Sequence, residues 1–106
     1  MKIEIKGFLH EIEKERTVSG KNGDTRIKDL LIKIPERKDD FGDVVQEVQF
    51  YPVSVFNKRI EELPLFLEKG AKVKVTCYLQ SRAWHKENEG TRYNLGLVLA
   101  KLEVIV

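Results

Sequence analysis

One segment of the chain, residues 50–84, changes its hydrophobic period twice, and this constrains the fold more than any other feature. Apolar residues alternate with a period of two in 50–56 and again in 71–84, which predicts a strand at each end. Between them, 57–69 carries apolar residues at helical spacing. These residues are Ile60, Leu63 and Leu67. The segment therefore predicts a strand–helix–strand unit, with Pro64 kinking the helix or splitting it into short turns.

The rest of the chain predicts further strands. The expected strands span 2–13, 27–34, 44–56, 71–84 and 91–106. Gly7 suggests a bulge or tight bend in the first strand, and Pro52 an edge position or bulge in the third. Five strands with one helix between the third and fourth is the element order of the OB-fold, a small Greek-key barrel. We therefore expect an all-β protein with a single OB-fold domain over residues 1–106.

Composition excludes several classes of protein. Hydrophobic residues make up 42% of the 106, which suits a globular chain, and no apolar run approaches the ~20 residues of a membrane span. The charged start is not a signal peptide. The single cysteine, Cys77, cannot form an internal disulfide and lies on an apolar row, so we expect a buried side chain and a cytoplasmic location.

Aromatic and basic side chains occupy the strand faces opposite the valines. In the third strand, Phe50 and Phe56 share one face; in the fourth, the non-core row runs from Lys72 to Trp84. Rings that stack bases, beside cations that contact phosphates, are what a single-stranded nucleic acid site requires. The candidate stacking residues are Phe50, Phe56, Tyr78 and Trp84, and the candidate phosphate contacts are Lys72, Lys74, Arg82, Lys86 and Arg92. The alternative is that the rings cover the helix or a loop, and that Tyr78 reflects strand propensity alone.

Catalytic and metal-binding motifs are not apparent. His10 and His85 lie on different strands, with no carboxylate or nucleophile at a triad-like spacing. The acidic residues at 39–43 do not have the ligand spacing of a calcium loop, and the glycines near 20–23 are not followed by the residues of a phosphate-binding loop. We therefore expect neither an enzyme nor a metal or cofactor site.

The segment from Phe50 to Tyr93 resembles the bacterial single-stranded DNA-binding protein family. The matching residues are Phe50, Val53–Phe56, Lys69-Gly70, Arg82-Ala83-Trp84 and Arg92-Tyr93. The resemblance implies that Phe56 and Trp84 stack bases, and Phe50 stands where the family usually has tryptophan. The family's ring near the second strand has no counterpart, and neither does its acidic, Phe-ending tail, so we expect no recruitment of other proteins through such a tail. The short primosomal replication proteins are a similar relative.

These observations together predict a protein that binds single-stranded DNA with little sequence preference, protecting or organising it in replication, recombination or repair. Two alternatives stay open: an interaction module of a replication or plasmid-maintenance complex, and an RNA-binding OB module. Because one small barrel offers few rings, we expect a homo-oligomer, a dimer or a tetramer, with an interface that includes residues 98–106.

Overall fold

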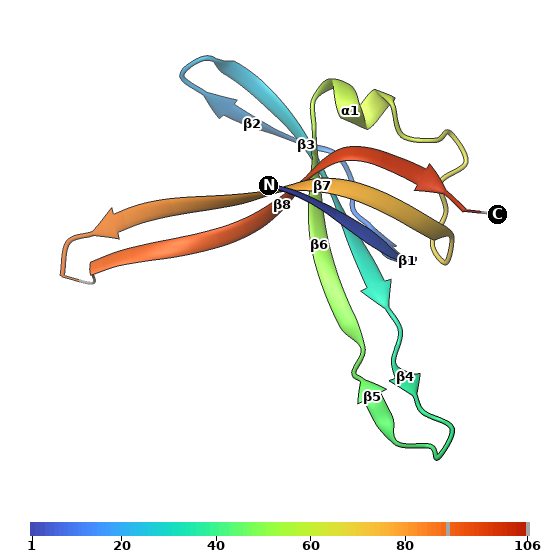
Figure 1. The fold of residues 1–106 in the computed structure, drawn as a ribbon. Helices are drawn as coiled ribbons and strands as arrows, with labels where there is room; N and C mark the ends of the chain where they lie inside the picture. Colours follow the sequence, from blue (N-terminus) through green and yellow to red (C-terminus); the bar gives the residue numbers. More distant parts are fainter. Residues whose placement is uncertain (89, 106) are drawn as a thin grey trace.

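The protein folds into a β-barrel from which three hairpin arms project (Figure 1). The computed structural model describes residues 1–88 and 90–105; the side chains of Arg82, Trp84 and Lys86 also lie outside the description. The elements are β1 (Lys2–Ile12), β2 (Arg16–Gly20), β3 (Gly23–Ile34), β4 (Arg37–Lys38), β5 (Val44–Gln46), β6 (Gln49–Phe56), α1 (Lys58–Glu61), β7 (Lys72–Lys86) and β8 (Gly90–Val104).

Five of the strands close the barrel. β1 pairs with β7 and β3, β3 pairs with β6, β6 with β8, and β8 with β7. All pairings are antiparallel except that of β6 with β8, which covers only Val53 and Ser54 on β6. The β6 edge facing away from β3 is therefore open at Pro52, the edge position expected for a residue without a backbone N–H. The predicted OB-fold, with one helix before the fourth barrel strand, is confirmed.

β1 changes partner along its length, and Gly7 lies where this happens. Residues 2–8 pair with β7, whereas residues 8–12 pair with β3. A Cβ at Gly7 would lie 2.6 Å from the Lys33 carbonyl oxygen and 3.0 Å from Cγ2 of Ile32. Only glycine allows this close approach, which explains the bend predicted at this position.

The core lies inside the barrel and contains only apolar side chains among the buried residues. The buried residues are Ile5, Leu9, Leu30, Ile32, Val53, Val55, Val73, Val75, Cys77 and Leu99. They are the inward-facing residues of the barrel strands, which alternate with outward-facing ones as the period-two pattern predicts. Burial also raises the pKa of the Cys77 thiol to about 11, which fits the buried, apolar role expected for this side chain.

Several predicted boundaries were wrong. The segment 57–69 forms one α-helical turn, Lys58–Glu61, followed by turns in which the Leu67 N–H donates to the Pro64 carbonyl at 3.3 Å. Pro64 prevents a longer helix, and Asn57 with a φ of 50° fixes where the turn begins. The strand expected at 44–56 is two strands, β5 and β6, interrupted at 47–48.

The sequence prediction also missed short strands in two of the arms. β2 pairs with the start of β3, which therefore begins at Gly23 and not at Ile27. β4, which pairs with β5, lies inside a segment that was expected to be a loop. The third arm is the long β7–β8 hairpin, which extends away from the barrel in Figure 1. Among the described residues, no helix has the length and apolar character of a membrane span, and no cluster of side chains suits a metal ion.

Candidate nucleic-acid interface

Two of the predicted stacking rings, Phe50 and Phe56, lie on the outer face of β6. Their neighbours Val53 and Val55 point the other way and are fully buried in the core. Phe50 is 46% exposed and Phe56 is partly buried. The two rings are six positions apart in the strand, which corresponds to about 20 Å along β6. The two rings therefore mark the ends of one outward line of side chains on a strand whose opposite face is fixed in the core.

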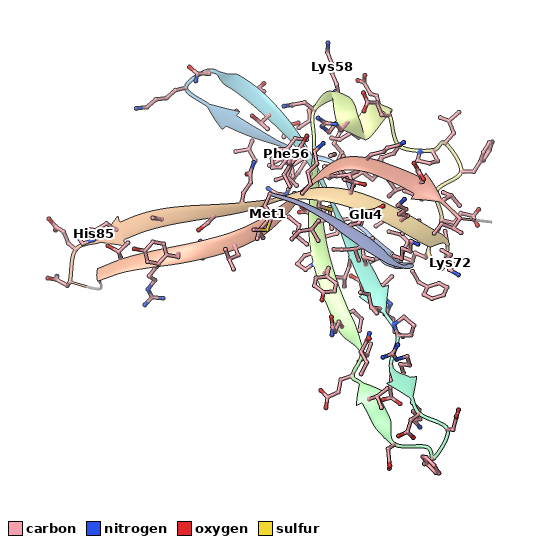
Figure 2. All side chains as sticks on the ribbon, in the orientation of Figure 1. Met1, Glu4, Phe56, Lys58, Lys72 and His85 are labelled. Atoms are coloured by element: carbon pink, nitrogen blue, oxygen red, sulfur yellow. The ribbon has the colours of Figure 1, made fainter. Side chains whose placement is uncertain are left out.

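Phe56 lies where the β7–β8 arm leaves the barrel (Figure 2). A groove of about 250 Å³ here is lined by Phe56 and Ile27 on one side and by Gln80, Asn94 and Leu95 of the arm on the other. The Asn57 side chain accepts a hydrogen bond from the Arg26 N–H at 3.0 Å, and the Asn57 N–H donates to the Arg26 carbonyl at 3.0 Å. These bonds join the end of β6 to β3 and so fix the backbone that carries Phe56.

A carboxylate with a neutralised charge, Asp29 of β3, lies beside the middle of this outward line of β6 side chains (the β6 line). Ser54 donates a hydrogen bond to Asp29 at 2.8 Å, and Arg16 contacts the other carboxylate oxygen of Asp29 at 3.1 Å. Asp29 and Ser54 are paired residues of β3 and β6 and so share the outer face. The Arg16 guanidinium, supplied by the β2 arm, offsets the negative charge that Asp29 would otherwise present to a polyanion.

The other end of the line, at Phe50, adjoins basic and aromatic side chains from other strands. Lys33 of β3 is paired with Phe50 on one side and with Phe8 of β1 on the other. Phe8 is in turn paired with Lys72 of β7. The ring of His10 lies 5.2 Å from the ring of Phe50, at an angle of 59°. The structure therefore brings Phe50 and Lys72, both predicted site residues, into one row across four strands.

Tyr78 and Lys74 belong to a different part of the surface. Both lie on the outer face of β7 where it pairs with the start of β1. The Lys2 ammonium is 5.5 Å from the centre of the Tyr78 ring, and Lys74 forms an ion pair with Glu4 at 2.6 Å. The hydrogen bond and the charge of Glu4 raise the pKa of Lys74. Both predicted residues thus already have partners from β1, away from the β6 line.

The β7–β8 arm carries the remaining predicted residues. The side chains of Arg82, Trp84 and Lys86 lie outside the described part of the structure, although their backbone belongs to β7. The strand register pairs Trp84 with Arg92, which is exposed. His85, labelled in Figure 2 at the far end of the arm, has its Nδ1 atom 3.3 Å from the Thr91 hydroxyl. These predicted site residues therefore belong to the arm and not to the barrel.

Comparison with known proteins identifies the family to which this fold belongs. A model of the single-strand binding protein family matches residues 3–105, almost the whole chain. The chain belongs to the single-strand binding protein family. The membership predicted from the residues between Phe50 and Tyr93 is thereby confirmed.

Solved structures of other family members share the fold. The yeast mitochondrial single-stranded DNA-binding protein Rim1, from S. cerevisiae, superposes with a TM-score of 0.66 at 20% identity, over 99% of this chain and 94% of that one. The single-stranded DNA-binding protein from Thermus aquaticus superposes with a TM-score of 0.68 at 19% identity, over 99% of this chain and 50% of that one. The Plasmodium falciparum protein, solved in complex with single-stranded DNA, gives 0.59 at 19% identity, over 99% and 94%.

Sequence reasoning did not place Phe8, His10 or Lys33 beside Phe50. For Phe8 a signal was present, because the outward row Lys2, Glu4, Lys6 continues to Phe8 at the same period. Lys33 could not be identified in this way, because its position opposite Phe50 depends on the strand register. The same outward row continues to His10, but the proximity of His10 to Phe50 depends on the pairing of β3 with both β1 and β6.

Proposed function

We propose that this member of the single-strand binding protein family binds single-stranded DNA with little sequence preference, by base stacking and phosphate contacts. The observation that carries the proposal is the pair of rings, Phe50 and Phe56, held outward on one strand whose other face is buried in the core. Every base has a flat face, so stacking on such rings tolerates any sequence. Family membership and the outward cations nearby support the same function.

In this mechanism the protein performs no covalent chemistry and needs no cofactor. Bases stack on Phe50, Phe56 and Trp84, while the phosphates displace counterions at basic residues. We assign the phosphate contacts to Lys72, Arg82, Lys86 and Arg92, and assign weaker roles to Tyr78 and Lys74 because Lys2 and Glu4 already contact them. Such binding protects or organises exposed single strands in replication, recombination or repair.

A mobility-shift experiment tests this proposal. Labelled dT oligomers of about 30 nucleotides are titrated with protein, with duplex DNA and RNA of the same length as competitors. We expect a shift at micromolar protein, and we expect duplex DNA to be a poor competitor, because paired bases offer no face for stacking. Equal competition by duplex contradicts the proposal, and stronger binding of RNA replaces DNA with RNA as the ligand.

We further propose that the protein acts as a homo-oligomer in a reducing, cytoplasmic environment. A single barrel offers few rings, so several copies on one strand raise the affinity by effective concentration. Val98 and Ala100 are partly buried on β8, and Val104 is 44% exposed, which suits an interface along the end of this strand. Val106 lies outside the described residues. Sedimentation of the purified protein tests this proposal. We expect a dimer, or failing that a tetramer, and we expect Val98→Lys to weaken the association. A monomer at tens of micromolar protein contradicts the proposal.

A further inference from the structure

We propose that the DNA strand also crosses the barrel on a second track, the transverse row, formed by Phe50, Lys33, Phe8 and Lys72 together with His10. In this track Phe8 and His10 are stacking residues, and Lys33 contacts a phosphate between Phe8 and Phe50. The inference rests on the proposed function, because it assumes that the ligand is single-stranded DNA. The transverse row runs across the strands, whereas the line of rings follows β6 along its length.

The transverse row alternates rings and cations across four hydrogen-bonded strands. From β6 to β7 the directly paired residues are Phe50, Lys33, Phe8 and Lys72. Directly paired residues share a face, and neighbouring strands are about 4.8 Å apart, so the two phenylalanine rings are attached about 10 Å apart with a lysine between them. A nucleotide chain has the same alternation of flat base and charged phosphate.

His10 shares the outward face of β1 with Phe8, because the two residues are two positions apart. Leu9 is paired with Ile32 and Glu11 with Leu31, so His10 lies at a bulge and has no paired residue on β3. From this position the imidazole lies against Phe50, which is two strands away. The result is a pair of rings from β1 and β6 that spans β3, the strand carrying Lys33.

The phenylalanine rings of the transverse row are exposed. Phe8 is 37% exposed and Phe50 is 46% exposed. Next to Phe8 a surface hollow of about 390 Å³ is lined by Leu9, His10, Lys33, Pro35 and Gly70, within the range of small-ligand pockets (roughly 300–1,000 Å³). The hollow gives a base stacked on Phe8 a site partly removed from water.

The charges of the transverse row suit a phosphate chain. None of its five residues is acidic, and within the described part of the chain neither Lys33 nor Lys72 forms an ion pair. By contrast, Lys74, two residues farther along β7, is paired with Glu4. The lysines of the row therefore contact a phosphate without first breaking a contact with a carboxylate.

Binding of short and long oligomers to the same variants tests the transverse row. A dT oligomer of about 5 nucleotides and one of about 15 span the range of site sizes for one OB-fold. Phe8→Ala and His10→Ala are compared with Phe66→Ala, which truncates a phenyl that is 90% exposed in the turns after α1, outside the row. We expect Phe8→Ala to weaken binding of the long oligomer by roughly 5- to 150-fold and of the short one far less. Phe66→Ala should change neither affinity.

A fluorescent variant keeps the test independent of any loss of stability in Phe8→Ala. Phe8→Trp combined with Trp84→Phe leaves one tryptophan, at the row. We expect the long oligomer to quench it and the short one to quench it much less. If the wild type binds both lengths but Phe8→Ala binds them equally well and the fluorescent variant is not quenched, the transverse row is wrong and the proposed function stands. If the wild type binds neither oligomer, both are wrong.

Discussion

The ring of His10 lies 5.2 Å from the ring of Phe50, although β1 and β6 are on opposite sides of β3. His10 lies at a bulge in β1, and the contact places an aromatic pair over the row that contains Lys33. Among the residues that the structure describes, all the buried ones are apolar, and the basic side chains lie outside the barrel. This separation of core and surface determines the effects expected from substitution.

Truncating the outward rings should affect binding more than stability. Phe50→Ala and Phe56→Ala are each expected to weaken binding of single-stranded DNA by ~1–3 kcal/mol, the value of one stacked base. Truncating a core phenylalanine costs about 3–5 kcal/mol of stability, and a ring on the outer face should cost much less. Oligomer titrations and thermal melts on the same variants separate the two effects. A large fall in melting temperature without a change in affinity would assign that ring to the core.

Lys72 and Lys74 should differ in their contribution to binding, although both point outward from β7. Each phosphate that a lysine neutralises steepens the dependence of log affinity on log salt by ~0.7 for a single strand. We expect Lys72→Ala to make the slope shallower by this amount, whereas Lys74→Ala should change it less because Glu4 holds the Lys74 ammonium. Glu4→Gln should then tighten binding by releasing that lysine. Equal slopes for the two alanine variants argue against this assignment.

Gly7→Ala should destabilise the barrel, because the added methyl group would overlap the Lys33 carbonyl oxygen at 2.6 Å. Overpacking of this kind costs typically ~1–3 kcal/mol. Gly96→Ala is the matched control, since nothing lies within 4 Å of its added Cβ. Denaturant unfolding of both variants measures the difference. Equal stabilities would show that β1 and β3 separate at Gly7 without cost.

Cys77 should make stability fall at alkaline pH. Burial raises the pKa of its thiol from 9.0 to about 11, because the core disfavours the thiolate. A pKa that is higher in the folded state gives a contribution that is fully present below pH 9 and is lost as the pH rises to about 11. Unfolding measured across this range should show a steeper fall for the wild type than for Cys77→Ala, which has no thiol. Parallel curves would contradict the burial of the thiol.

The sequence predicted the barrel strands and their inward faces because alternation of apolar residues is a local pattern. For example, the pattern places Val53 and Val55 on the inward face of the strand. It places Phe50 and Phe56 on the outward face, and the structure shows the same division. The helical part of 57–69 is shorter than the spacing of its leucine and isoleucine residues suggested, whereas the expected division into short turns at Pro64 is present. The apolar pattern there reflects turns that pack on the barrel.

The arrangement around Phe50 could not be predicted, because it depends on register between distant strands. Phe8, Lys33 and Phe50 are far apart in the sequence, and only the pairings of β3 with β1 and β6 align them. The pairing of Lys74 with Glu4 has the same origin. Sequence patterns identified the outward residues, and the register decides which of them act together.

The most direct test of base stacking with phosphate contacts is a fluorescence titration of the wild type with dT oligomers at several salt concentrations. Trp84 is the only tryptophan, so its emission reports on one proposed stacking residue. We expect quenching at micromolar protein and an affinity that falls linearly in log salt, because stacking alters the indole environment and phosphate contacts release counterions. A folded protein whose emission does not change at low salt, or whose affinity does not depend on salt, would contradict the account.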